Sequence, residues 1–99
     1  MISLKLHRRE EQVLVAACDE SLLDKEITDD KRGIKINLRK DFYYQQIVPK
    51  EVFIEFLKIA TIGNFFGDET INAAIEANYI DKNCILYIGG IPHAQFVRV

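Results

Sequence analysis

The spacing of the apolar residues changes along this chain of 99 residues, and the change restricts the folds that it can adopt. Over residues 2–6 and 34–38 apolar and polar residues alternate, which is the period of a strand with one buried face. Over residues 49–61 and 68–78 apolar residues recur at helical spacing, and alternation returns over residues 94–98. This order predicts an α+β fold: a mostly antiparallel sheet of four to five strands, with two helices packed on one face.

The first two strands are predicted to form a hairpin. Residues 13–18 are continuously apolar, as in a strand that is covered on both faces, and the polar residues 8–12 before them predict a five-residue loop. The Asp19 carboxylate is then expected to cap a short helical turn. A turn over residues 29–33 leads into the alternating strand at residues 34–38.

The middle of the chain is expected to be largely helical. Residues 41–48 predict a helical turn followed by a short strand, and Pro49 suits the first position of the helix that follows. Residues 63–67 contain two glycines and should end that helix, with Asp68 capping the next one. A further strand is expected over residues 84–88.

Length and composition predict one domain, residues 1–99, with enough apolar residues for a single core. No apolar run approaches the roughly 20 residues that span a bilayer, and the first residues do not form a signal peptide. We therefore expect a cytoplasmic protein with no membrane partner.

Cys18 and Cys84 belong to no metal-binding motif, so neither a metal nor another cofactor is expected. They are either buried free thiols or, if their strands are neighbours, a disulfide. The oligomeric state is not specified by the sequence.

The leading candidate for a binding site lies just before the last predicted strand. A short segment there contains Gly89, Gly90, Pro92, His93 and Gln95. The glycines would let backbone amides approach a ligand, the proline would fix the shape, and the histidine and glutamine would supply donors and acceptors. The alternative is a structural turn in which the His93 ring bonds a backbone carbonyl.

A second candidate lies at Asn64 and Gly67, directly before the second helix. A glycine at a helix start leaves free amides that can bind an anion such as phosphate. Asp68 beside those amides would compete with an external anion. Its presence favours the alternative, in which the segment is an inter-helix loop whose phenylalanines belong to the core.

A third candidate is the basic segment 31–40, which contains five basic residues and no acidic residue. It precedes the aromatic residues Phe42, Tyr43 and Tyr44, and basic side chains beside aromatic ones would suit phosphate contacts and base stacking. The alternative is a solvated outer face with the aromatic residues in the core. A neighbouring strand that shares this face would strengthen the prediction. The predicted nucleic-acid residues are Lys5, Lys31, Arg32, Lys35, Arg39 and Lys40.

The net charge of −2 argues against a protein that coats nucleic acid by bulk electrostatic attraction. We therefore expect a non-catalytic module that binds RNA or a ribonucleoprotein, in the translation machinery, through weak or structured-target recognition. The alternative is a small enzyme or small-ligand-binding protein with a pocket at the Gly89–Gln95 loop. That alternative requires residues 63–68 to lie beside this loop. No residue pattern in the chain identifies a nucleophile with its base.

Several of these positions together resemble a small archaeal family, the domain of unknown function number 424. The resemblance covers nearly the whole chain. Asn78 stands where the family commonly has a glycine at a helix end, and asparagine also adopts the left-handed conformation required there. The resemblance implies an archaeal cytoplasmic protein with no established activity. Its most specific part is residues 89–95, and its weaker parts are Ala17–Glu20, Leu22 with Leu23, Phe42 with Tyr43, and Asn64 with Gly67.

Overall fold

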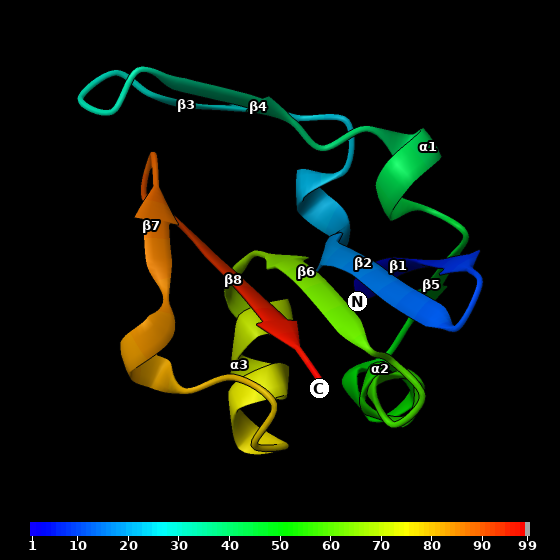
Figure 1. The fold of residues 1–99 in the computed structure, drawn as a ribbon. Helices are drawn as coiled ribbons and strands as arrows, with labels where there is room; N and C mark the ends of the chain where they lie inside the picture. Colours follow the sequence, from blue (N-terminus) through cyan, green and yellow to red (C-terminus); the bar gives the residue numbers. More distant parts are fainter. Residues whose placement is uncertain (99) are drawn as a thin grey trace.

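The computed structural model describes residues 1–98, which form two sheets and three α-helices (Figure 1). The larger sheet has six strands in the order β5-β1-β2-β6-β8-β7. These strands are β1 (Ile2–Arg9), β2 (Gln12–Asp19), β5 (Gln46–Val48), β6 (Ile62–Phe66), β7 (Leu86–Ile88) and β8 (Ile91–Val97). A separate hairpin consists of β3 (Glu26–Asp29) and β4 (Ile34–Asn37). The helices are α1 (Lys40–Tyr43), α2 (Lys50–Leu57) and α3 (Asp68–Glu76), and short 3-10 turns lie at Glu20–Leu22 and Lys82–Cys84.

The α+β class is confirmed, but the sheet differs from the prediction in strand number and in type. It has six strands where four to five were expected. It is mixed, because β2 and β6 run parallel while its other neighbouring pairs are antiparallel. The parallel pair follows from one strand, β6, that the sequence pattern did not indicate.

Residues 62–66, which were expected to contain a helix-ending loop, form the β6 strand inside the sheet. Gly63 is required there because the ring of Phe96 occupies the space where a side chain would begin. Phe65 is fully buried, so the strand is covered and does not show the simple alternation of a half-buried one. The preceding helix ends at Leu57, earlier than the expected residue 61.

One turn and one strand also differ from the sequence prediction. The β1–β2 connection is a two-residue turn at Glu10 and Glu11, not a five-residue loop, because Arg9 already pairs with Gln12. Glu10 has a φ of 56°, in the left-handed region that such tight turns use. The β3 strand was not predicted, since Ile27 is its one buried residue and charged residues surround it.

The two faces of the larger sheet are covered differently (Figure 1). Helices α2 and α3 cover one face, where Phe53, Phe65 and Ile71 belong to one apolar cluster. The β3–β4 hairpin and α1 lie over the opposite face, and a second cluster there includes Leu38 and Tyr43. The expected packing of two helices on one face is therefore confirmed, with a second, partial layer on the other face.

Asp19 caps a helix, but not the one expected. Its carboxylate accepts hydrogen bonds from the backbone nitrogens of Glu69 (3.1 Å) and Thr70 (2.8 Å) and from the Thr70 hydroxyl (2.8 Å). These groups lie in the first turn of α3, whose N-cap residue is Gly67. Asp68 is thus not the cap of this helix, and Asp19 joins the end of β2 to the start of α3.

The carboxy-terminal residues form a strand, as predicted. β8 lies between β6 and β7, but it begins at Ile91, so the connection from β7 contains Gly89 and Gly90 alone.

Cys18 and Cys84 are free thiols; Cys18 is buried as expected, whereas Cys84 is exposed. Within residues 1–98 no helix is long and apolar enough to cross a membrane.

Candidate functional site

The two segments that the small-ligand alternative requires to converge do lie side by side, as neighbouring strands. In the β6–β8 ladder Asn64 pairs with Gln95, and Phe66 pairs with His93. The Asn64 side-chain oxygen accepts a hydrogen bond of 3.1 Å from the Tyr43 hydroxyl, so Asn64 faces the side that carries α1 and the hairpin. Asn64, His93 and Gln95 therefore share that face of the sheet, because alternate residues of paired strands point the same way.

The His93 ring bonds a backbone carbonyl, which is the contact expected if His93 has a structural role and does not bind a ligand. Its Nδ1 lies 2.9 Å from the Phe65 carbonyl oxygen, so this nitrogen carries the donated proton. Its ring stacks on Phe66 with 4.1 Å between centroids. Burial lowers the pKa of His93, and the bond to the Phe65 carbonyl opposes that change without reversing it. A neutral ring with this contact is suited to holding β8 against β6.

We expect His93→Gln to reduce the pH dependence of stability. Because burial lowers the folded-state pKa of His93, the unfolded chain takes up the proton first as the pH falls through about 6.5. The wild type should therefore lose stability between about pH 7 and pH 5, and the variant should lose less. Urea unfolding across this range measures the difference. Above about pH 7.5 the two curves should run parallel; equal slopes in acid would show that His93 does not titrate in this way.

One glycine in each predicted binding segment has a structural role. Gly89 donates its backbone N–H to Asp29 Oδ2 at 3.1 Å, and a side chain there would overlap the Thr28 carbonyl oxygen. That amide, with smaller contributions from the Arg32 amide and guanidinium, lowers the pKa of Asp29. Gly67 donates its N–H to the Pro92 carbonyl at 2.9 Å.

The predicted anion site at the start of α3 is filled from within the chain. The Asp19 carboxylate accepts from the exposed amides there, as an external phosphate would. The predicted recognition loop is likewise largely strand, since Pro92 and His93 lie in β8. A methyl group added at Gly90 would meet no atom of residues 1–98 within 4 Å, so Gly90 is the open position of the β7–β8 turn.

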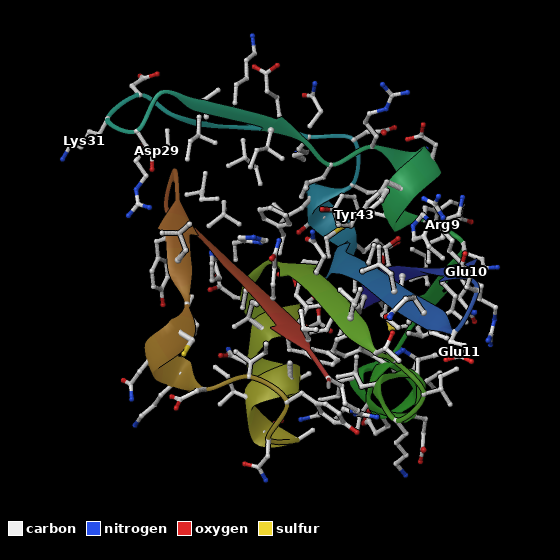
Figure 2. All side chains as sticks on the ribbon, viewed as in Figure 1. Arg9, Glu10, Glu11, Asp29, Lys31 and Tyr43 are labelled. Carbon is white, nitrogen blue, oxygen red and sulfur yellow. The ribbon has the colours of Figure 1, made fainter. Side chains whose placement is uncertain are left out.

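The basic segment forms ion pairs on the outer hairpin and α1. Four of its cations lie within 4 Å of a carboxylate: Arg32 with Asp29, Lys35 with Glu26, Arg39 with Asp41, and Lys40 with Asp24. Lys5 belongs to the other sheet and donates to the Asp41 carbonyl at 2.8 Å. The shared strand face that would have strengthened this prediction is not formed within residues 1–98, because β4 is not in the sheet that contains β1. Figure 2 shows Lys31 at the hairpin tip, far from Arg9 at the end of β1.

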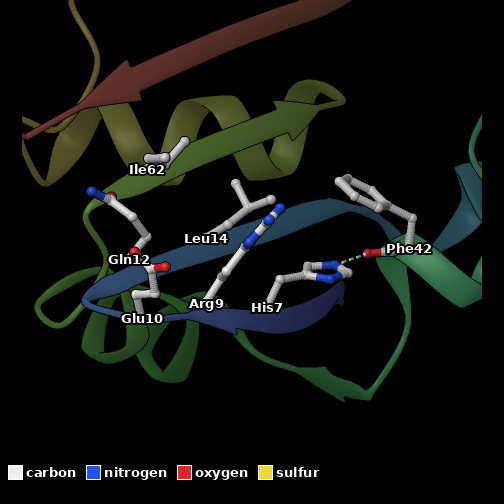
Figure 3. Close-up of a pocket in the computed structure, with 7 residues that line it drawn as sticks. All are labelled: His7, Arg9, Glu10, Gln12, Leu14, Phe42 and Ile62. Atoms are coloured by element: carbon white, nitrogen blue, oxygen red, sulfur yellow. Dashed lines mark hydrogen bonds between the residues drawn. The ribbon is translucent and has the colours of Figure 1, made fainter.

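A groove that the sequence did not indicate lies on the part of the sheet that α1 and the hairpin leave open (Figure 3). Its volume is about 370 Å³, within the range of ligand-binding clefts. The signal for it in the sequence was the alternation that puts His7 and Arg9 on one side of the first strand. The lining residues are His7, Arg9, Glu10, Gln12, Leu14, Phe42 and Ile62.

One wall of the groove is a pair of stacked rings. His7 and Phe42 have centroids 4.5 Å apart and planes inclined at 29°. His7 Nε2 lies 2.8 Å from the Phe42 carbonyl oxygen, so Nε2 donates the hydrogen bond that fixes the ring. The Phe42 side chain remains partly exposed. The two rings therefore form an aromatic surface that is fixed in place on the sheet.

The polar lining residues differ in what they already bind. The Gln12 side-chain oxygen accepts from the Thr61 hydroxyl at 2.8 Å, which leaves the Gln12 amino group free to donate. Within residues 1–98 Arg9 and Glu10 make no side-chain hydrogen bond, and neither has an oppositely charged group within 4 Å. Among residues 1–98 the groove thus presents one cation and one carboxylate without a partner, beside an apolar floor.

The buried polar groups near this face are poorly suited to nucleophilic chemistry. Burial raises the pKa of the Cys18 thiol to about 12 and that of the Tyr43 hydroxyl to about 12, so both groups hold their protons. Within the described part of the chain no group of three His, Cys, Asp or Glu residues is placed to hold a metal ion. The groove offers a stacking surface, hydrogen-bonding groups and one cation, and groups of this kind are suited to binding a ligand.

Comparison with known proteins agrees with this fold. The chain is similar to a crystal structure of an uncharacterized conserved protein from Methanopyrus kandleri, an archaeon, with a TM-score of 0.85 and 21% sequence identity. The similarity covers 99% of this chain and 93% of that one, and it concerns the fold. No curated protein matches the chain. A family model does match, over residues 7–99, and the chain therefore belongs to the family described as "Protein of unknown function (DUF424)".

Proposed function

We propose that this protein is a non-catalytic binding module that receives single-stranded RNA, free or within a ribonucleoprotein, on the open part of its sheet. The observation that carries the proposal is the groove in which the His7–Phe42 ring pair stands beside the Arg9 guanidinium, which has no carboxylate partner among residues 1–98. Base stacking on an aromatic side chain contributes about 1–3 kcal/mol per base, and a neighbouring arginine adds a phosphate or base-edge contact.

The surroundings of the groove extend this surface along the sheet. Asn64 and Gln95 pair across β6 and β8 on the same face, and the Gln95 side chain is exposed. Amide side chains of this kind donate to and accept from base edges. Val97, 69% exposed, and Ile62 pair beside them and add apolar area on which a second base can lie. A strand of RNA crossing the sheet from β1 to β8 would meet all of these groups.

The charge distribution predicts which kind of binding to expect. The hairpin cations are matched by carboxylates, and the whole chain carries a net charge of −2. Affinity should therefore come from stacking and hydrogen bonds more than from phosphate contacts. We expect a shallow salt dependence, equivalent to about one or two phosphate contacts, each giving a slope of roughly −0.7 for a single strand.

The test is fluorescence anisotropy of a labelled single-stranded RNA of mixed sequence, titrated with protein at low salt. Arg9→Ala and Phe42→Ala should each weaken binding by about tenfold, equivalent to about 1.4 kcal/mol. Two matched variants serve as controls. Arg39→Ala removes the same charge from a guanidinium that bonds both Asp41 oxygens at 3.1 Å, and Tyr87→Ala removes an exposed ring on β7 away from the groove.

The loss of RNA affinity is compared between the two groove variants and the two control variants. Binding that falls only in the groove variants supports the proposal, once thermal unfolding shows that all four are folded. Equal losses for Arg9→Ala and Arg39→Ala would indicate bulk electrostatic attraction, and would contradict a site in the groove. Absence of binding at low salt would refute the proposal itself.

A further inference from the structure

We propose that the groove selects guanine, with the Arg9 guanidinium and the Glu10 carboxylate taking two different edges of the same base. This inference rests on the proposed function, because it names the base that the RNA-binding groove accepts. The Glu10 carboxylate suggests it, because a negative charge is an unusual group to find in a site for a polyanion.

Arg9 and Glu10 are adjacent in the sequence and carry opposite charges, yet they do not pair with each other. Both line the groove, and no salt bridge involves either among residues 1–98. Glu10 is held at the hairpin tip with a φ of 56°. Figure 3 shows the Arg9 side chain extending across Leu14 while the Glu10 carboxylate lies nearer Gln12. The hairpin thus presents a planar donor and a planar acceptor at separate positions in one groove.

Guanine is the one common base that satisfies both groups at once. Its Watson–Crick edge has two adjacent donors, N1–H and the N2 amino group, which match the two oxygens of a carboxylate. Its O6 and N7 are adjacent acceptors, and a guanidinium binds them with two parallel hydrogen bonds. Adenine, cytosine and uracil each place an acceptor next to their ring or amino donor, so a carboxylate facing that edge would lose a hydrogen bond and meet a lone pair.

The Glu10 carboxylate also determines which part of the RNA can lie beside it in the groove. A phosphate placed beside Glu10 would be repelled, whereas the neutral donor edge of a base would be attracted. The stacked rings of His7 and Phe42 then cover the face of the base. Stacking alone accepts every base, since each has a π-face. Selection among bases must therefore come from the polar groups, and in this groove those groups match guanine.

The test uses short single-stranded RNAs that differ at one central nucleotide within a uridine strand. The wild type should bind the strand with guanosine at least about tenfold more tightly than those with adenosine, cytidine or uridine. Inosine lacks the N2 amino group, so replacing guanosine by inosine should remove most of that preference. In Glu10→Gln one oxygen becomes a donor that faces the guanine donors, and the preference over adenosine should fall below about threefold.

Glu11→Gln is the matched control, because Glu11 lies beside Glu10 in the same turn and does not line the groove. It should keep the full preference for guanosine. If the wild type binds all the strands equally, the inference about guanine is overturned while RNA binding stands. If none of the strands binds, the proposed function fails and this inference with it. A preference that survives both in Glu10→Gln and with inosine would also overturn the inference, because it would not depend on the donor edge.

Discussion

Deleting residues 94–99 should abolish the cooperative thermal transition of this protein. The deletion removes most of β8, which pairs with β6 through Ala94, Gln95 and Phe96. Phe96 packs against the helix-side core, where its ring lies 5.8 Å from that of Phe65, and Ala94 is buried. Truncating a fully buried phenylalanine costs about 3–5 kcal/mol; the partly buried Phe96 should contribute less than that, but β6 would also lose its ladder partner. A domain of this size has only about 5–15 kcal/mol in total.

The deletion would also release the end of α2. The Arg98 guanidinium donates to the Lys58 carbonyl at 3.1 Å and to the Leu57 carbonyl at 3.4 Å, and the Arg98 N–H donates to the Thr61 carbonyl at 2.7 Å. The measurement is calorimetry together with far-ultraviolet circular dichroism. Val97→Ser is the control, since Val97 is 69% exposed and its replacement should shift Tm by no more than a few degrees. A truncated chain that still melts cooperatively would show that β8 is dispensable.

Local patterns predicted the elements whose partners are near in sequence. The alternation at Ile2, Leu4 and Leu6 identified β1, and helical spacing identified α2 and α3. The β6 strand was missed because the residues that pack around it lie far from it in the sequence. Gly63 and Asn64 resemble turn residues, but the glycine is needed where the Phe96 ring lies against the strand. No window of local sequence contains both residues of that contact.

The residues that the sequence singled out and the residues that line the groove are different parts of the same sheet face. The sequence identified Asn64, His93 and Gln95, and the structure places them on one sheet face, but His93 is committed to the Phe65 carbonyl. The groove was not predicted, because it forms only when β1, β2, α1 and β6 come together. Two carboxylate partners of the basic segment, Glu26 for Lys35 and Asp24 for Lys40, come from other elements, so a local pattern does not show these pairs.

Gly67→Ala should destabilise the protein by about 3–5 kcal/mol, which is large for an exchange of one hydrogen for a methyl group. Gly67 has a φ of 107° and a ψ of 154°, a conformation that is essentially restricted to glycine. A methyl group there would overlap the Asp19 carboxylate, with its oxygens only 2.6 and 2.7 Å away. Moving the carboxylate would break its bonds to the first turn of α3 and leave the buried Thr70 hydroxyl without its partner.

A double-mutant cycle separates backbone strain from loss of the cap. Gly33→Ala is the control for strain, because Gly33 also has a positive φ, 65°, but no atom of the described residues lies near the added methyl group; it should cost about 1–2 kcal/mol. In Asp19→Ala the carboxylate is already gone, so adding Gly67→Ala should cost only its backbone strain, which exceeds that of the Gly33 control because the Gly67 conformation is essentially restricted to glycine. The two changes should therefore be non-additive by about 1–3 kcal/mol in urea unfolding. Additive changes would contradict a shared contact, and the start of α3 would then have to be stabilised by groups other than the carboxylate of β2.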